Sequence, residues 1–493
     1  MSKCIHPLFS FLIFLALVFF SSVISTVNAM RSTLQLLLWT MYGCIFTVSL
    51  ILPIKFKYQR NVLFFVFMVA SFLYIGHSAN TSAFSFLSDS SYQFILPSHG
   101  SHNHLGDLAG LFFSSLISFT SQYIFTGLLM GFTLTIMAIS FSKSAFLGVL
   151  VVLALVTFQK KGKYFLLSFL IVIFSLCIIG LYTQELSKIP LIHAGQQIMQ
   201  KKLHLAPKPI LSVRDYYFPQ VIRAWQTAPL EQLFFGFGSG NYIYPSIKTG
   251  STTELTPTET HNIFLSILAE NGPLSLLWFA VFCILILFYG LKAHNKSFYL
   301  FIFLLVNFQT DFTYSIPFFM GMFFFFAGQS VHNEKITNST EFRFLSLSLV
   351  CMIVLTLFAG YSYFSIQNNK HLLDAQLKIA LKNKDGVRSQ QIISRLELIT
   401  PYEERELVSW SFQQEMLQNL PDAIRLLEKL SVYSPRWYLL YLPHQFELQK
   451  KSNIDLKKYI IRRKNDFSQF PFSKEEKNQL NFVCNEYAKM SCI

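Results

Sequence analysis

The chain has 493 residues, of which 52% are apolar and 13% charged, and its mean hydropathy is +0.43. Soluble chains carry about 25% charged residues, so this composition excludes an array of soluble domains and predicts a polytopic membrane protein. The 54 Phe and 22 Tyr give ample apolar surface to bury, which excludes disorder and a disulfide-stapled miniature fold. The net charge of +14 is spread along the chain, which indicates attraction to headgroups and anionic ligands, with no nucleic acid as a partner.

A transmembrane helix needs about 20 apolar residues to cross about 30 Å of hydrocarbon. We therefore expect an all-α polytopic transmembrane helical bundle with about 11 spans. The expected spans are residues 8–27, 33–54, 61–77, 105–119, 123–141, 145–158, 164–183, 273–291, 297–310, 315–330 and 344–364. The first one also resembles a signal peptide cut after Ala29, because Lys3 precedes a long apolar run; we favour an uncleaved helix.

Basic residues in the short connections predict the orientation. With alternating crossings, one side of the membrane receives Lys55, Lys57, Arg60, Lys160, Lys161, Lys163, Lys292 and Lys296. Lysine and arginine accumulate in cytoplasmic loops, so we expect this side to be cytoplasmic. The opposite, external side then receives the loops 78–104 and 184–260 and everything from residue 365 onward.

The last quarter of the chain differs in composition, because 35 of the 66 charged residues fall in residues 370–493. We expect a transmembrane domain at 1–364, which includes the external loop 184–260, and a soluble helical domain at 365–493. Its segments are punctuated by Pro401, Pro421, Pro435 and Pro443. The offset of Ala423 from Pro435 resembles a tetratricopeptide repeat, but the early positions of that repeat are missing, so a generic helical bundle is preferred.

Two of the seven cysteines, Cys484 and Cys492, lie in this terminal region. An oxidising external compartment would permit a disulfide between them. Spacing alone leaves the pairing open, because it does not show that the two side chains approach each other.

The external loop ends at His261, and an apolar stretch continues to Leu291. As one helix this stretch would be about 46 Å long, which exceeds one perpendicular span. Gly272-Pro273 can break it, since proline is tolerated in the first turn of a helix. We expect a short helix from His261 at the outer interface and the true span from residue 273. Glu270 lies about 180° around that helix from His261, so we expect a structural or capping role for it.

Lys143, in Ser142-Lys143-Ser144-Ala145, is a cation at the external junction of two short spans. A charge near hydrocarbon is costly and therefore a functional candidate, with snorkelling to headgroups as the alternative. Three imidazoles crowd an earlier external loop: His99, His102 and His104. Only Asp107 stands at ligand spacing beside them, so zinc is the less favoured interpretation and we expect no metal site.

Glycines alternate in Gly236-Phe237-Gly238-Ser239-Gly240-Asn241, inside the long loop. Glycine permits positive φ and close backbone approach. The stretch lacks both the G-x-G-x-x-G spacing and a βαβ unit, so it does not form a nucleotide fingerprint and a structural turn is expected.

These separated pieces together resemble the O-antigen ligase family. The pieces are Asn103-His104-Leu105-Gly106, Ser142-Lys143-Ser144-Ala145, Arg214 with Trp225, Pro229 and the glycine stretch, and His261-Asn262 with Ala269-Glu270-Asn271-Gly272. The resemblance covers about residues 100–330. It implies a multi-pass enzyme of the polytopic glycosyltransferase class in the bacterial inner membrane, with a periplasmic C-terminal domain. Such an enzyme moves a glycan from undecaprenyl pyrophosphate to an acceptor, which is lipid A-core, a growing polymer or a protein, without a metal or cofactor.

Roles follow from the resemblance residue by residue. Lys143, Arg214 and the substitute candidate Arg223 would hold the pyrophosphate, with Arg214 also counted as catalytic, and His261 would be the catalytic loop histidine. Fixed cations can stabilise the charge that develops on the leaving pyrophosphate in place of a metal. Histidine, with a reference pKa of about 6.5, suits deprotonation of an acceptor hydroxyl. Lys143 departs from the family's usual arginine, and lysine loses bidentate phosphate geometry.

Ligase, polysaccharide polymerase and protein oligosaccharyltransferase stay open within this family. A transporter of lipid-linked glycans would place charges through the membrane core, whereas here the cations gather at the external face. A non-catalytic scaffold would be indifferent to the loss of His261 or Arg214.

Overall fold

The computed structural model of the chain describes residues 5–24, 27–78, 102–117, 123–140, 142–160, 221–222, 225, 228–242, 260–293, 295–332, 339–401, 404–433, 435–469 and 474–492. This part of the chain is helical and contains no strand, so the all-α prediction is confirmed for it. Ten of the eleven expected spans coincide with helices, and the remaining one, 164–183, lies outside the described residues. The total of eleven stays a prediction.

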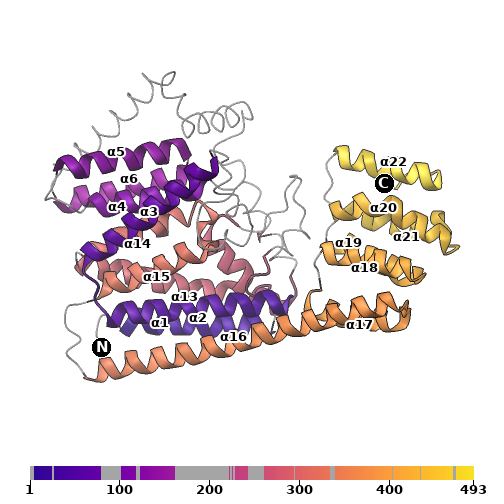
Figure 1. Cartoon of the computed structure of the whole chain (residues 1–493), viewed down its shortest axis with the longest axis horizontal. Helices are drawn as coiled ribbons and strands as arrows, with labels where there is room; N and C mark the ends of the chain where they lie inside the picture. The colour runs from indigo at the N-terminus through magenta and orange to yellow at the C-terminus, as the bar shows by residue number, and fades with distance from the viewer. Residues whose placement is uncertain are drawn as a thin grey trace, which may run out of the picture.

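The N-terminal three quarters of the described chain form a helical bundle (Figure 1). Its elements are α1 (Ile5–Ile24), α2 (Ala29–Ile51), α3 (Phe56–Ser78), α4 (His102–Ile117), α5 (Tyr123–Ser140), α6 (Lys143–Lys160), α11 (Leu230–Phe235), α13 (Ile263–Ala293), α14 (Ser297–Asn307), η3 (Phe312–Ser315), α15 (Pro317–Val331) and α16 (Ser339–Lys382). Helices α1, α2, α13 and α16 are long and apolar enough to cross a membrane. Shorter apolar stretches lie in α4, α5, α6, α14 and α15, which is compatible with a membrane bundle.

The bundle interior is rich in phenylalanine. Rings packed within 6.5 Å of one another include Phe11, Phe14, Phe46, Phe279, Phe282, Phe323 and Phe324. Small residues leave room for such rings: a Cβ at Gly110 or Gly148 would lie 2.7 Å from the nearest carbon of Phe303. Close packing of this kind holds helices together in lipid, where the hydrophobic effect does not.

One end of the bundle, which we call the basic end, carries two of the three predicted cationic connections; residues 161–163 of the third lie outside the described residues. There Gln329 Nε2 donates to the carbonyls of Ser49 and Leu52, at 2.6 and 2.9 Å, and Ser297 Oγ donates to Gln59 Oε1 at 2.8 Å. These bonds join the ends of α2, α3, α14 and α15. Five of the predicted basic residues lie in the connections at this end: Lys55, Lys57, Arg60, Lys292 and Lys296. The structure therefore brings them to one side of the bundle.

Helix α16 runs without a break from the bundle into the C-terminal region, past residues 364 and 365 (Figure 1). The end of the bundle where it leaves is the tail end. Beyond it follow α17 (Gly386–Ile399), α18 (Glu404–Met416), α19 (Leu420–Tyr433), α20 (Pro435–Lys451), α21 (Leu456–Gln469) and α22 (Lys474–Ala488), which we call the tail. Buried apolar side chains form one large cluster in the bundle, from Leu8 to Ala359, and another in the tail, from Leu373 to Cys492.

The tail helices begin and end largely where the prolines predict. Pro421 and Pro435 lie at the starts of α19 and α20. The expectation for Pro443 was wrong, because α20 continues through it. Leu442 and Phe446 beside it are fully buried, so packing outweighs the loss of one helical hydrogen bond at this proline.

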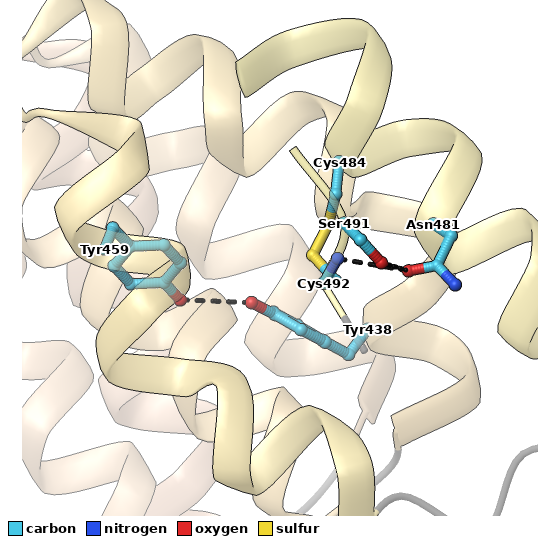
Figure 2. The surroundings of a disulfide bond; sticks show 6 residues. All are labelled: Tyr438, Tyr459, Asn481, Cys484, Ser491 and Cys492. Atoms are coloured by element: carbon cyan, nitrogen blue, oxygen red, sulfur yellow. Dashed lines mark hydrogen bonds between the residues drawn. A yellow bond between two sulfur atoms is a disulfide. The ribbon is translucent and has the colours of Figure 1, made fainter. Parts of the chain in front are cut away.

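The tail ends in a disulfide between Cys484 and Cys492, whose Cα atoms are 5.8 Å apart (Figure 2). The Asn481 side chain accepts from the Cys492 N–H at 3.1 Å and from Ser491 Oγ at 2.8 Å. These bonds tie the terminal segment to α22. The pairing that the sequence left open is present in the structure.

Candidate active site

His261 lies two residues before the start of α13 at the tail end, with its backbone in the left-handed region at φ 55°. The helix that follows contains a non-helical residue, Gly272, with φ 80° and ψ 174°, and then Pro273. The predicted break is therefore confirmed. It divides α13 into a short helix after His261 and a longer apolar helix.

The histidine corner, residues 260–262, is anchored to the turn between α14 and α15, residues 307–316, which we call the α14–α15 turn. Thr260 Oγ1 lies 3.0 Å from Tyr314 Oη. The Asn262 Nδ2 donates to Gln309 Oε1 at 3.1 Å, and the next residue's N–H donates to the Phe308 carbonyl at 3.0 Å. Asn262 also caps α13, since its Oδ1 accepts the Leu265 N–H at 3.1 Å. His261 itself is partly buried.

A second group of contacts joins the same turn to the serine–lysine junction, residues 142–144. Asp107 on α4 is completely buried, and its Oδ1 accepts from Ser142 Oγ at 2.6 Å, Ser144 Oγ at 2.9 Å and Asn307 Nδ2 at 2.8 Å. The Ser144 hydroxyl also lies 3.2 Å from Asp311 Oδ2. The α14–α15 turn thus contacts both segments that carry predicted site residues.

The glycine loop, residues 236–242, is the structural turn that was predicted, since Gly236, Gly238 and Gly240 all have positive φ. The Phe237 N–H donates to the Ala269 carbonyl at 2.9 Å. The loop also contacts the start of α2, where Ser32 Oγ donates to the Ser239 carbonyl at 3.0 Å. It therefore packs between α2 and the break in α13.

Glu270 organises this loop. Its Oε2 accepts the Gly240 N–H at 3.0 Å, and the carboxylate also bonds the Tyr242 N–H. Arg31 interacts electrostatically with this carboxylate. The backbone carbonyl of Glu270 accepts from Ser21 Oγ at 2.9 Å. The structural role predicted for Glu270 is confirmed.

The predicted site residues divide into those that the structure describes and those that it does not. His261 is described in full, whereas Lys143 is described as the first residue of α6 without its side chain. Arg214 and Arg223 lie outside the described residues. The roles of His261, Lys143, Arg214 and Arg223 all stay predictions.

Around the earlier cluster of His99, His102 and His104, the described residues form no metal centre. His99 is outside that part, as is the side chain of His102, and the His104 ring packs 6.4 Å from the Phe319 ring. Among the described side chains, no group of three His, Cys, Asp or Glu is arranged to hold a metal ion.

Several polar residues at the tail end were missed in the sequence: Arg31, Ser32, Asn307, Asp311 and Thr313. Asp107 was considered only as a metal ligand. Asp311 carried a usable signal, because it is a carboxylate between two nearly uncharged apolar runs, where an ionisable group is costly. Ser32, Asn307 and Thr313 carry no such signal, since single Ser, Thr and Asn residues are common in apolar helices.

The tail end joins two chemical capabilities. A partly buried imidazole can accept a proton from a nearby hydroxyl. Helix α6 begins at Lys143, and the first turn of a helix presents unpaired N–H groups and a positive dipole end, which favour anions.

Comparison with protein families gives a match to part of the chain. Neither the curated proteins nor the solved structures contain a match to this chain. The family model described as O-antigen ligase matches residues 128–280, which include the serine–lysine junction, the glycine loop and the histidine corner. Over residues 128–280 the chain therefore matches the O-antigen ligases, which confirms the resemblance for that stretch and indicates glycosyltransferase or ligase activity at a membrane.

Proposed function

We propose that this protein transfers an oligosaccharide or polysaccharide from undecaprenyl pyrophosphate to an acceptor hydroxyl at the periplasmic face of the bacterial inner membrane. The family match over residues 128–280 supports the reaction class. The observation that carries the proposal is the α14–α15 turn, which contacts both the histidine corner and the serine–lysine junction. A base and a phosphate-binding cation on these two segments would share one rigid support.

The basic end is then cytoplasmic and the tail end periplasmic. The positive-inside rule supports this orientation, because two of the three predicted short basic connections, those with Lys55, Lys57 and Arg60 and with Lys292 and Lys296, meet at the basic end. In this arrangement residues 1–364 form the transmembrane domain and residues 365–493 a periplasmic domain, with α16 passing from one to the other.

The reaction needs two kinds of assistance. The acceptor oxygen forms a bond to the anomeric carbon while the bond from that carbon to the pyrophosphate oxygen breaks, and undecaprenyl pyrophosphate leaves. Lys143, Arg214 and Arg223 would stabilise the negative charge on the leaving group, as fixed cations do without reorganisation. His261 would take the proton of the acceptor hydroxyl.

The distribution of charge favours a transferase over a transporter. Within the described bundle, the buried carboxylates are Asp107, Glu270 and Asp311, and each is bonded to a segment at the tail end. A transporter would need ionisable groups along a path through the membrane core. Ligase, polymerase and protein oligosaccharyltransferase share the same donor chemistry, and the accumulating or missing glycoconjugate distinguishes them.

The test is replacement of His261 by asparagine in a strain that lacks the chromosomal copy. Asparagine adopts the left-handed region readily, so this variant removes the base without straining φ 55°. We expect glycan transfer to fall about 100-fold or more, the usual contribution of a general base. The readout is the glycoconjugate lost on deletion, whether capped lipopolysaccharide, long polymer or glycoprotein.

The matched control is His371→Ala, because this histidine is exposed on α16 and should be dispensable for transfer. Equal protein levels of both variants in the membrane fraction are required. Wild-type transfer by His261→Asn would contradict the catalytic assignment.

A further inference from the structure

The serine–lysine junction is held on both sides of Lys143 by one carboxylate. Ser142 is the N-cap of α6, since its Oγ accepts the Ala145 N–H at 3.2 Å. The same hydroxyl donates to Asp107 Oδ1 at 2.6 Å, and the hydroxyl of Ser144 lies 2.9 Å from that oxygen. The residues before and after Lys143 are therefore tied to a single buried point on α4.

The same carboxylate reaches the turn that supports His261. Asn307 Nδ2 donates to Asp107 Oδ1 at 2.8 Å, and Asn307 Oδ1 accepts from Thr313 Oγ1 at 2.6 Å. Thr313 is fully buried and also lies 3.4 Å from Asp107 Oδ2. Its neighbour Tyr314 bonds Thr260, which precedes His261. A continuous chain of hydrogen bonds and short backbone steps thus connects the two segments.

We propose that Asp107 is a positioning residue that fixes the start of α6, and with it Lys143, relative to the α14–α15 turn and His261. This inference rests on the proposed function, because Asp107 can affect transfer in this way only if Lys143 binds the pyrophosphate of the donor. Asp107 does not touch substrate in this account. It acts by setting where the backbone of Lys143 lies.

The carboxylate suits this task because one of its oxygens accepts three donors from two segments, the serine–lysine junction and the α14–α15 turn. An asparagine could keep most of this arrangement: its oxygen would accept the same donors, and its amide would face the Thr313 hydroxyl, which can accept a hydrogen bond. An alanine would leave the Ser142 hydroxyl and the Asn307 amide buried without this acceptor, which is costly in a low-dielectric interior, whereas Ser144 would keep Asp311 as an acceptor. Asparagine thus removes the charge of Asp107 but keeps its hydrogen bonds, whereas alanine removes both. Comparing the two variants shows whether the hydrogen bonds or the charge matter.

The experiment measures initial transfer rates of the full-length protein in proteoliposomes, with undecaprenyl-pyrophosphate-linked glycan as the varied substrate. We expect Asp107→Ala to raise the donor KM about tenfold, as the loss of one or two hydrogen bonds would, and to leave the acceptor KM unchanged. Asp107→Asn should stay close to wild type. Lys143→Ala should raise the donor KM, and the double variant Asp107→Ala/Lys143→Ala should be no worse than Lys143→Ala alone.

A gentler variant covers the case in which Asp107→Ala does not fold. Ser144→Ala removes one hydroxyl and should raise the donor KM in the same direction. Its matched control is Ser115→Ala on α4, a buried serine whose Oγ donates to the Phe112 carbonyl of its own helix at 2.6 Å. That control should leave both KM values unchanged.

The outcomes separate the two claims. If Lys143→Ala raises the donor KM but Asp107→Ala and Ser144→Ala do not, or if their effects multiply with that of Lys143→Ala, the positioning role is overturned and the proposed function stands. Equal loss in Asp107→Asn and Asp107→Ala would also overturn positioning by hydrogen bonds. If Lys143→Ala leaves the donor KM unchanged, both this inference and the assignment of Lys143 in the proposed function fail.

Discussion

Gly272 shapes the tail end because its backbone lies against another backbone without an intervening side chain. A Cβ at this position would lie 2.0 Å from the Phe234 carbonyl oxygen, and a Cβ at Gly236 would lie 2.4 Å from the Glu270 carbonyl carbon. Both residues also have positive φ, which L side chains avoid. The glycine loop can therefore pack against the break in α13 only if positions 236 and 272 are both glycine.

Gly272→Ala should destabilise this contact. The strained φ alone costs about 1–3 kcal/mol, and the overlap with Phe234 adds to it. We expect a lower midpoint of thermal unfolding for the detergent-solubilised protein, together with reduced transfer.

Gly127→Ala is the control, because a Cβ there meets no heavy atom within 4 Å and alanine favours helix by about 1 kcal/mol. An unchanged midpoint for Gly272→Ala would contradict the packing described here.

At the level of residues, the sequence predicted those whose chemistry or backbone is distinctive. His261 marks the end of the loop, Gly272-Pro273 marks the break, and Glu270 was correctly given a structural role. The sequence could not predict that Asp107 bonds several segments. Its partners lie between α5 and α6 and in the turn after α14, about 35 and 200 residues away along the chain. Such long-range pairing depends on how helices pack, which hydropathy does not encode.

Among the elements, the α14–α15 turn has the largest influence on the site. It follows the end of α14 at Asn307, whose carbonyl accepts the N–H groups of Thr310 and Asp311 at 2.9 and 3.0 Å. Pro317 then starts α15, where its missing N–H costs nothing. The expected spans 297–310 and 315–330 left only four residues between them, so the sequence indicated a short turn but not its contacts.

Helix α16 combines two segments that the sequence predicted separately. The sequence indicated a span at 344–364 and amphipathic helix from 368, and the structure has one helix from Ser339 to Lys382. Residues 361–370 contain no proline or glycine, so nothing interrupts the helix between its apolar and amphipathic parts. The tail is thereby attached through a helix rather than a linker.

For the molecule as a whole, composition predicted the two regions, and the structure has a buried cluster in each. Orientation across the membrane is the feature that most needs a test. The Cys484–Cys492 disulfide provides one, because structural disulfides form and persist in oxidising compartments such as the periplasm.

We expect the disulfide to be present in intact cells that are alkylated before lysis. Trypsin cleaves after Lys477 and Lys489, so a non-reduced digest should contain peptides 478–489 and 490–493 joined through the two cysteines. Cys44, Cys283 and Cys351 are free in the structure and serve as unlinked references. Recovery of both tail cysteines as alkylated thiols would place the tail in the cytoplasm and contradict the proposed orientation.

The central claim is that the histidine corner and the serine–lysine junction form one reaction centre at the periplasmic end of the bundle. An electron cryo-microscopy structure of the protein in lipid nanodiscs with undecaprenyl pyrophosphate tests it most directly. We predict the pyrophosphate within hydrogen-bonding reach of Lys143, with His261 facing the side from which an acceptor hydroxyl approaches. Pyrophosphate bound at the basic end, or remote from both residues, would contradict the account.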